Sequence, residues 1–273
     1  MNKTKQKKTR IAIAGAMGRM GITLIKEIQK NKNTILSAAL VLKNNPFITK
    51  DIGEIIGIGR VGVLISDTLD EKQHDFDVLI DFTKSSSTLK YLKQCSMLKK
   101  NIVIGTTGFS QEEKSIIQSY SKKIAIVMSS NFSIGINLLL QLVQKTTETI
   151  GDKSDIEIIE YHHRNKLDAP SGTALSIGEA IAKVMNWDLK KQSIYSREKN
   201  KKIREQNKIG FSTIRAGDII GKHTVMYASD GEQINITHIA SNRHAFSKGA
   251  IQAAIWLHQK KIGLFNMEHV LSF

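Results

Sequence analysis

Two adjacent histidines and a lysine precede a run of small residues, and these residue types at this spacing favour proton transfer beside an anion site. The stretch 160–174 reads EYHHRNKLDAPSGTA, with His162, His163 and Lys166 in its first half. Histidine and lysine are side chains that proteins use as general acids. Backbone N–H groups at a helix start attract anions, and the Ser-Gly-Thr at 171–173 lets a carboxylate or phosphate approach closely. The stretch therefore predicts general acids next to an anion cradle.

The surrounding pattern predicts the elements that position these residues. Residues 155–161 (DIEIIEY) alternate polar and apolar side chains, which is typical of a half-buried strand. The histidines then lie where this strand gives way to a loop, and loops at strand ends often carry chemistry. Pro170 fits the first position of a turn or helix, and apolar residues recur at helical spacing over 174–184.

Other interpretations of the histidines are weaker. A single histidine is usually structural or solvated, but two with a nearby lysine at a small-residue helix start fit the pattern of an acid beside an anion stabiliser. A metal site is disfavoured, since adjacent histidines rarely point at one ion and Cys95, the one cysteine, has no partner at ligand spacing. We therefore predict no metal.

Length and composition indicate a folded enzyme of a reducing compartment. The chain has 273 residues, 41% of them hydrophobic, and only two prolines, so it is long enough for one large or two medium domains with real cores. One cysteine excludes an intramolecular disulfide framework. The basic start is followed by only a short apolar run at 11–16, which resembles neither a signal peptide nor a membrane anchor. We expect a cytoplasmic protein with no membrane partner.

A net charge of +15 is typical of proteins that bind nucleic acid, anionic membranes or acidic small molecules. However, the basic residues are spread through the chain, and the local clusters at 3–10 and 199–204 lack the aromatic interleaving of a single-strand binder. We expect lysines on solvated faces, some attraction of anionic small ligands, and no nucleic-acid partner.

A glycine turn follows the first strand pattern. Residues 10–14 read as a short buried strand, GAMGRMG at 15–21 follows, and the amphipathic run 22–28 comes next. Strand, glycine-rich turn and helix are the layout that places a pyrophosphate on a helix N-terminus. The spacing is G-x-x-G-x-x-G instead of the usual G-x-G-x-x-G, so an ordinary tight turn remains an alternative for this motif taken alone.

Repeated buried strands favour an α/β fold with a Rossmann-like, doubly wound parallel sheet. Short buried strand patterns recur at 34–42, 77–82, 101–104 and 124–128, and helical patterns lie between the later ones. In such sheets ligands bind at the carboxyl ends of the strands. Those ends carry small, hydroxyl-bearing or amide-bearing residues, as a nucleotide site requires.

The second half predicts an α+β substrate domain with a mostly antiparallel sheet. Residues 134–150 read as one long helix, and three alternating segments follow later at 209–216, 222–229 and 232–240. Short polar turns favour an antiparallel meander with helices packed on one face. A final helical pattern covers 245–260.

The combined motifs resemble the 4-hydroxy-tetrahydrodipicolinate reductase (dihydrodipicolinate reductase) family of the diaminopimelate and lysine pathway. The resemblance covers nearly the whole chain and is carried by IAIAGAMGRMG, DFT, IGTTGF, SSNFSIGIN, IEIIEYHHRNKLDAPSGTA and RAGDIIGKHT. It implies a nicotinamide-binding domain at 1–132, completed by 241–273, and a substrate domain at 133–240 whose sheets assemble a homotetramer. The implied reaction delivers hydride from NADPH or NADH to C4 of a ring dicarboxylate, with loss of water, and yields tetrahydrodipicolinate.

The resemblance also assigns residues. It makes His162 a proton donor and Lys166 the second one. The substrate-binding residues it implies are His163, Gly172, Thr173 and Arg243. The cofactor-binding residues it implies, with the end of the second strand included, are Gly15, Ala16, Met17, Gly18, Arg19, Met20, Val41, Leu42, Lys43, Lys84, Gly105, Thr106, Thr107, Ser129, Ser130, Asn131 and Phe132.

The end of the second strand departs from the family pattern. Sheets that prefer NAD usually carry an acid there, roughly 20 residues after the glycines, and the family commonly has Glu-Arg. Here Val41-Leu42 is followed by Lys43, so we expect NADPH to be used at least as well as NADH, the alternative being that both are equivalent. Another NAD(P)-dependent oxidoreductase acting on a small amino or keto acid remains the alternative function, although it would not need the His-His-Lys cluster.

Overall fold

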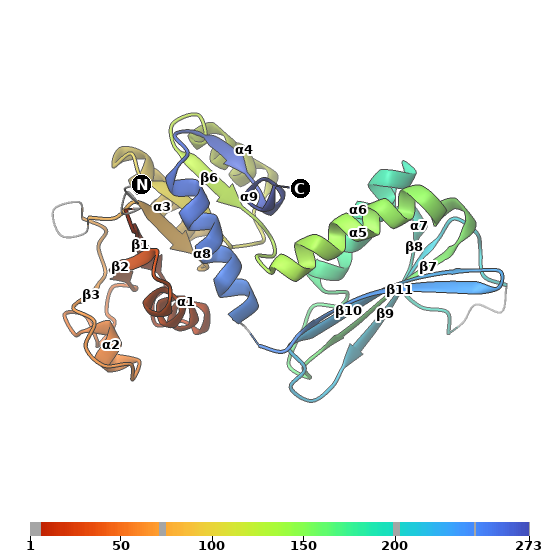
Figure 1. Cartoon of the computed structure of the whole chain (residues 1–273), viewed down its shortest axis with the longest axis horizontal. Coiled ribbons are helices and arrows are strands. Elements are labelled where there is room, and N and C mark those ends of the chain that lie inside the picture. Colours follow the sequence, from red (N-terminus) through yellow and green to blue (C-terminus); the bar gives the residue numbers. More distant parts are fainter. Residues whose placement is uncertain (1–6, 71–74, 199–202, 243, 273) are drawn as a thin grey trace, which may run out of the picture. The chain divides into compact units, whose positions relative to one another are not determined.

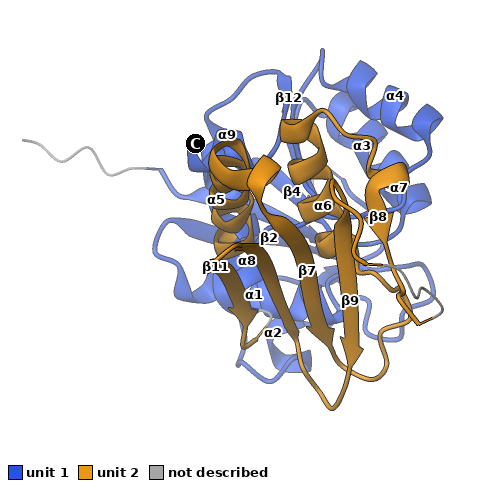
Figure 2. Ribbon diagram, turned by 90° about the vertical axis from the view of Figure 1, so that its right-hand side faces the viewer, with its two compact units in different colours: residues 1–133, 244–273 blue, residues 134–243 orange. Residues whose placement is uncertain are grey.

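The computed structural model describes residues 7–70, 75–198, 203–242 and 244–272, and the chain divides into two compact units. Unit 1 comprises Met1–Ser133 with His244–Phe273, and unit 2 comprises Ile134–Arg243 (Figure 2). The C-terminal segment thus belongs to the same unit as the N-terminal half of the chain.

Unit 1 is built on a seven-stranded sheet in the order β12-β6-β5-β4-β1-β2-β3, in which every neighbouring pair is parallel (Figure 1). Its strands are β1 (Thr9–Ala14), β2 (Thr34–Leu40), β3 (Ile65–Ser66), β4 (Val78–Asp81), β5 (Asn101–Ile104), β6 (Ala125–Met128) and β12 (Gly263–Phe265). The chain runs from β1 outward to β2 and β3 and then returns to β4 on the other side of β1. The carboxyl ends of β1 and β4 therefore flank the switch point, where such sheets bind ligands.

Helices cover both faces of this sheet, because alternate side chains of each strand point to opposite sides. Ile11 and Ile13 of β1 belong to the core that contains the apolar residues of α1 and α8. Ala12 and Ala14 belong to the core that contains those of α3 and α4. The predicted doubly wound parallel sheet is confirmed. The helices of unit 1 are α1 (Arg19–Lys30), α2 (Ile52–Ile55), α3 (Ser85–Met97), α4 (Gln111–Tyr120), α8 (His244–His258) and α9 (Met267–Leu271).

Unit 2 contains a five-stranded sheet in the order β11-β10-β7-β9-β8. Apolar residues of α5 and α6 pack with Ile156 and Ile158 of β7 in a single core. The strands are β7 (Asp155–His162), β8 (Ser193–Ile194), β9 (Ile209–Arg215), β10 (Gly221–Ser229) and β11 (Glu232–Ala240). The helices are α5 (Ile134–Ile150), the 3₁₀ helix η1 (Gly151–Lys153), α6 (Gly172–Met185) and α7 (Leu189–Gln192).

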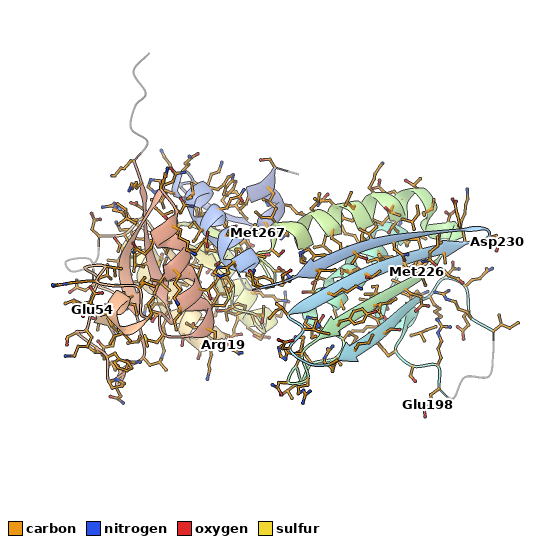
Figure 3. The ribbon with its side chains drawn as sticks, turned by 60° about the horizontal axis from the view of Figure 1, so that its bottom comes forward. Arg19, Glu54, Glu198, Met226, Asp230 and Met267 are labelled. Carbon is orange, nitrogen blue, oxygen red and sulfur yellow. The ribbon has the colours of Figure 1, made fainter. Side chains whose placement is uncertain are left out.

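The strand order of unit 2 differs from the predicted meander. Strands β10 and β11 form the expected antiparallel hairpin, with Asp230 in its turn (Figure 3). Strand β9, however, does not neighbour β10, because β7 lies between them and pairs antiparallel with β10 and parallel with β9. Periodicity identifies a strand and its buried face but not its neighbours, and the central place of β7 buries its apolar face against the helices.

A helix that spans a membrane needs about 20 consecutive apolar residues. Among the residues that the structure describes, no helix is both long and apolar enough to meet that requirement, and α5 has 17 residues.

Candidate active site

A row of polar side chains crosses the unit 2 sheet near the end of β7. Glu160 of β7 stands in register with Thr213 of β9 on one side and with His223 of β10 on the other. Glu160 and His162 share the buried face of β7, and Glu160 is only 1% exposed. The apolar face of this strand therefore ends in buried polar groups, which need partners.

One oxygen of the Glu160 carboxylate accepts three hydrogen bonds. The backbone N–H of Ser171 donates to Oε1 at 2.9 Å, the Thr213 hydroxyl at 3.2 Å, and Nη2 of Arg215 at 2.8 Å. Burial opposes the charged form, but the adjacent His162 and the bonds from Ser171 and Arg215 outweigh it and hold the pKa of Glu160 well below its usual range. The carboxylate is therefore ionised at neutral pH.

The other oxygen faces two histidines. Oε2 of Glu160 lies 2.7 Å from Nδ1 of His162 and 3.9 Å from Nε2 of His223. The two imidazole rings meet edge to face, with their centroids 5.1 Å apart. Burial first, and then the nearby charge of His162, lower the pKa of His223 to about 4. His223 is therefore a neutral imidazole at neutral pH.

Ser171 links this cluster to helix α6. Its Oγ caps the helix by accepting from Ala174 N at 3.2 Å, and it lies 3.2 Å from Nε2 of His223. Because Oγ accepts from the helix, its own hydrogen is available for His223. Helix α6 begins at Gly172, which is exposed and whose missing Cβ would meet nothing within 4 Å. We call Gly172 and Thr173, at the start of α6, the carboxylate cradle; the N-terminus of a helix favours an anion.

The loop after β7 carries the remaining predicted residues. Nζ of Lys166 lies 2.8 Å from Oδ1 of Asp168. Burial opposes ionisation of Asp168, but the Lys166 ammonium prevails and lowers the pKa of that carboxyl. Nη2 of Arg215 also donates to the Asp168 carbonyl at 2.6 Å. His163 is half-buried, and its Nδ1 has no hydrogen-bond partner among the described residues. The loop thus holds a lysine and a histidine beside β7.

The donor atoms of Glu160, His162 and His223 lie within 4.8 Å of one another, a spacing that could hold a metal ion. Sequence reasoning found no third ligand, because His223 comes from a different strand. The guanidinium of Arg215, which bonds the same carboxylate, opposes a second cation there. The set is better suited to handling protons than to binding a metal.

In unit 1, the glycine turn (residues 15–21) has the geometry of a pyrophosphate site. Gly15 has φ +67°, a conformation that favours glycine. Helix α1 begins at Arg19 (Figure 3), and no side chain caps its start. A Cβ at Gly21 would overlap the carbonyl oxygen of Gly15, so only glycine lets the helix lie this close to the turn. These features fit a dinucleotide cofactor.

The other predicted cofactor residues follow the carboxyl ends of parallel strands. Residues 41–43 follow β2, with Val41 buried and the next two exposed, and Lys84 is exposed at the start of α3. Residues 105–107 follow β5 and 129–132 follow β6, where the Phe132 ring packs against Phe82 at 5.4 Å. One edge of the sheet therefore carries all of these predicted residues.

Sequence reasoning missed part of the cluster. Glu160 had one local indication, an acid on the apolar register of a strand directly before a histidine. Arg215 and His223 lie in the motif RAGDIIGKHT, but no function was assigned to them, since only the strand order brings them to Glu160. Arg243, which was predicted to bind substrate, lies outside the described residues.

Comparisons with known proteins agree over nearly the whole chain. The family model "Dihydrodipicolinate reductase, N-terminus" matches residues 9–132, and "Dihydrodipicolinate reductase, C-terminus" matches residues 135–271. A 4-hydroxy-tetrahydrodipicolinate reductase of Buchnera aphidicola subsp. Schizaphis graminum is 64% identical over 268 residues, which are 98% of each chain. Another from Buchnera aphidicola subsp. Baizongia pistaciae is 57% identical and covers 96% of this chain and 97% of the relative.

Solved structures share the fold. A dipicolinate-bound dihydrodipicolinate reductase from Paenisporosarcina sp. TG-14 has a TM-score of 0.77 at 24% identity and covers 96% of this chain and 99% of its own. An amine dehydrogenase from Mycobacterium smegmatis has a TM-score of 0.61 at 10% identity, with 95% of each chain covered. At these identities the likeness concerns the fold alone.

Proposed function

The chain belongs to the dihydrodipicolinate reductase family, and from this premise we propose how its residues divide the reaction. The activity is the nicotinamide-dependent reduction of 4-hydroxy-tetrahydrodipicolinate to tetrahydrodipicolinate. The glycine turn and the strand ends of unit 1 hold the cofactor. The polar cluster, the following loop and the carboxylate cradle of unit 2 hold the substrate.

The chemistry of the substrate matches these groups. A ring dicarboxylate needs anion sites, and the start of α6 at the exposed Gly172 presents the positive end of a helix dipole. The nicotinamide supplies the hydride. Reduction of a conjugated imine leaves electron density that an acid must protonate, and we assign this to His162, with Lys166 as second donor. His163 is proposed as a further substrate contact.

The observation that carries this proposal is the direct link between the buried His162 and the start of α6 through Glu160. The test is a coupled assay that follows the loss of nicotinamide absorbance with freshly made substrate. The purified chain is expected to oxidise the reduced cofactor only when substrate is present. A chain that binds NADPH but turns over a panel of small keto acids instead would contradict the assignment.

We predict that Thr173→Val weakens inhibition by pyridine-2,6-dicarboxylate. The similar reductase from Paenisporosarcina was solved with dipicolinate bound, which makes this molecule a suitable probe. If Thr173 donates to a ligand carboxylate, its loss removes a charge-assisted bond of about 1.5–3 kcal/mol, so the inhibition constant is expected to rise about tenfold or more. Thr149→Val, on an exposed part of α5, is the control. Equal inhibition of both variants would place the carboxylate elsewhere.

We also predict that NADPH is used at least as well as NADH, and that Lys43→Glu shifts the preference toward NADH. Lys43 is exposed just after β2, where NAD-preferring sheets carry an acid for the ribose 2′-OH. A glutamate would accept a hydrogen bond from the ribose 2′-OH of NADH and repel the 2′-phosphate of NADPH. The ratio of kcat/KM for NADH to kcat/KM for NADPH is therefore expected to rise about tenfold. Lys50→Glu, in the following loop, is the control. A wild-type preference for NADH above about tenfold would contradict this assignment.

A homotetramer stays a prediction from the family resemblance, and a cytoplasmic location stays a prediction from the composition and the N-terminal sequence. Analytical ultracentrifugation at several concentrations tests the first, and a mass that fits a monomer throughout would overturn it.

A further inference from the structure

We propose that Glu160 is a positioning residue that holds the proton donor and the carboxylate cradle in one arrangement. The proposal rests on the functions proposed above for His162 and for the start of α6. A single buried carboxylate reaches both parts, with one oxygen near the imidazole and the other bonded to the residue that begins the helix.

The first link fixes the imidazole of His162. A carboxylate beside one ring nitrogen determines which nitrogen carries hydrogen and how the ring is turned. Because Glu160 Oε2 lies 2.7 Å from Nδ1, the opposite nitrogen, Nε2, is left for substrate. Nε2 lies next to Gly221 of β10, where a Cβ would approach it to 3.3 Å. The absence of a side chain at Gly221 keeps this nitrogen uncovered by its neighbouring strand.

The second link fixes the cradle. Ser171 N donates to Glu160 Oε1 at 2.9 Å, and the same residue caps α6 through its hydroxyl. The Ser171 hydroxyl also meets the neutral His223, which stands in register with Glu160. The first turn of α6 is therefore tied through Glu160 to β7, the strand that carries His162, and through His223 to the neighbouring strand β10.

The charges are consistent with this function. An unpaired carboxylate next to an anion site would repel a dicarboxylate substrate, but Arg215 neutralises Glu160 at 2.8 Å. Arg215 is itself held by the carbonyls of Asp168 and Ile214. A buried ion pair is weak support for stability, since desolvation opposes it, so its presence at this position favours an organising function.

The test is Glu160→Gln in the full chain, because the amide keeps the shape and can still accept from Ser171 but loses the charge. We expect kcat to fall about 100-fold, inhibition by pyridine-2,6-dicarboxylate to weaken, and NADPH affinity to stay within about twofold. Glu157→Gln is the matched control: it lies on the same strand and also pairs with arginines, Arg197 and Arg204, but makes no contact with the cluster. Its kcat is expected to equal that of the wild type.

A double-mutant cycle separates positioning from structure. If Glu160 acts through His162, Glu160→Gln adds little to the loss already caused by His162→Ala. If the loss of kcat in the double variant equals the product of the losses in the two single variants, the proposal is overturned. A His162→Ala variant with near-normal kcat would instead overturn the proposed acid, a distinct outcome. Should the Gln variant fail to fold, Glu160→Asp keeps the charge but withdraws it by one methylene; wild-type kcat in that variant would also contradict positioning.

Discussion

Replacing His162 or Lys166 by alanine is expected to lower kcat by about 10²–10⁴-fold, the usual contribution of a positioned general acid. Both residues belong to unit 2, whereas the glycine turn belongs to unit 1, so NADPH affinity is expected to change less than about twofold. The losses concern proton delivery in the transition state, so kcat and kcat/KM should fall together. Steady-state assays measure kcat and kcat/KM, and a fluorescence titration measures the NADPH affinity.

Lys166→Arg distinguishes proton donation from charge. Arginine keeps the positive charge that pairs with Asp168 but does not release its proton in proteins. Its kcat is therefore expected to be nearly as low as that of the alanine variant. His258→Ala, at the end of α8 in unit 1, is the control for a histidine outside the cluster. Near-full kcat in His162→Ala or Lys166→Ala would end the assignment for that residue.

Local sequence patterns predicted much of the fold and failed where strand order decides. A buried strand or a long helix can be identified from the periodicity of one segment, and the glycine turn from its spacing. The structure contains all of these predicted elements. The place of β7 between β9 and β10 has no such local pattern. The packing of the whole sheet determines which strands are neighbours. The turns in the sequence predicted only a meander, in which consecutive strands lie side by side.

The candidate site shows the same division. His162, His163 and Lys166 were found because they stand within five residues of one another in the sequence. Arg215 and His223 lie beside the same carboxylate but more than fifty residues away in the sequence, on strands that flank β7. Glu160 could have been noticed as an acid on an apolar strand face, whereas the motif RAGDIIGKHT contains Arg215 and His223 but does not show that they contact Glu160.

The glycine turn gives the second large expected effect. Gly21→Ala is expected to lower NADPH affinity by about tenfold or more and to reduce the melting temperature. The new Cβ would overlap the carbonyl oxygen of Gly15 and lie 2.8 Å from backbone atoms of Ala16, so helix α1 must move away from the turn. Overpacking costs about 1–3 kcal/mol, which is about 2–10 °C in a chain of this size. The pyrophosphate site at the helix start would move with α1.

Gly18→Ala provides the comparison within the same turn. Gly18 has φ −75°, which any residue adopts, and its Cβ would lie 3.2 Å from Gly15 O, a tight contact that a small shift relieves. This variant is therefore expected to melt closer to the wild type than Gly21→Ala, even if its added methyl group hinders the cofactor. Thermal unfolding without ligand and NADPH titration separate the two effects. If Gly21→Ala had the melting temperature and the NADPH affinity of the wild type, the explanation that Gly21 allows helix α1 to pack closely on the turn would be wrong.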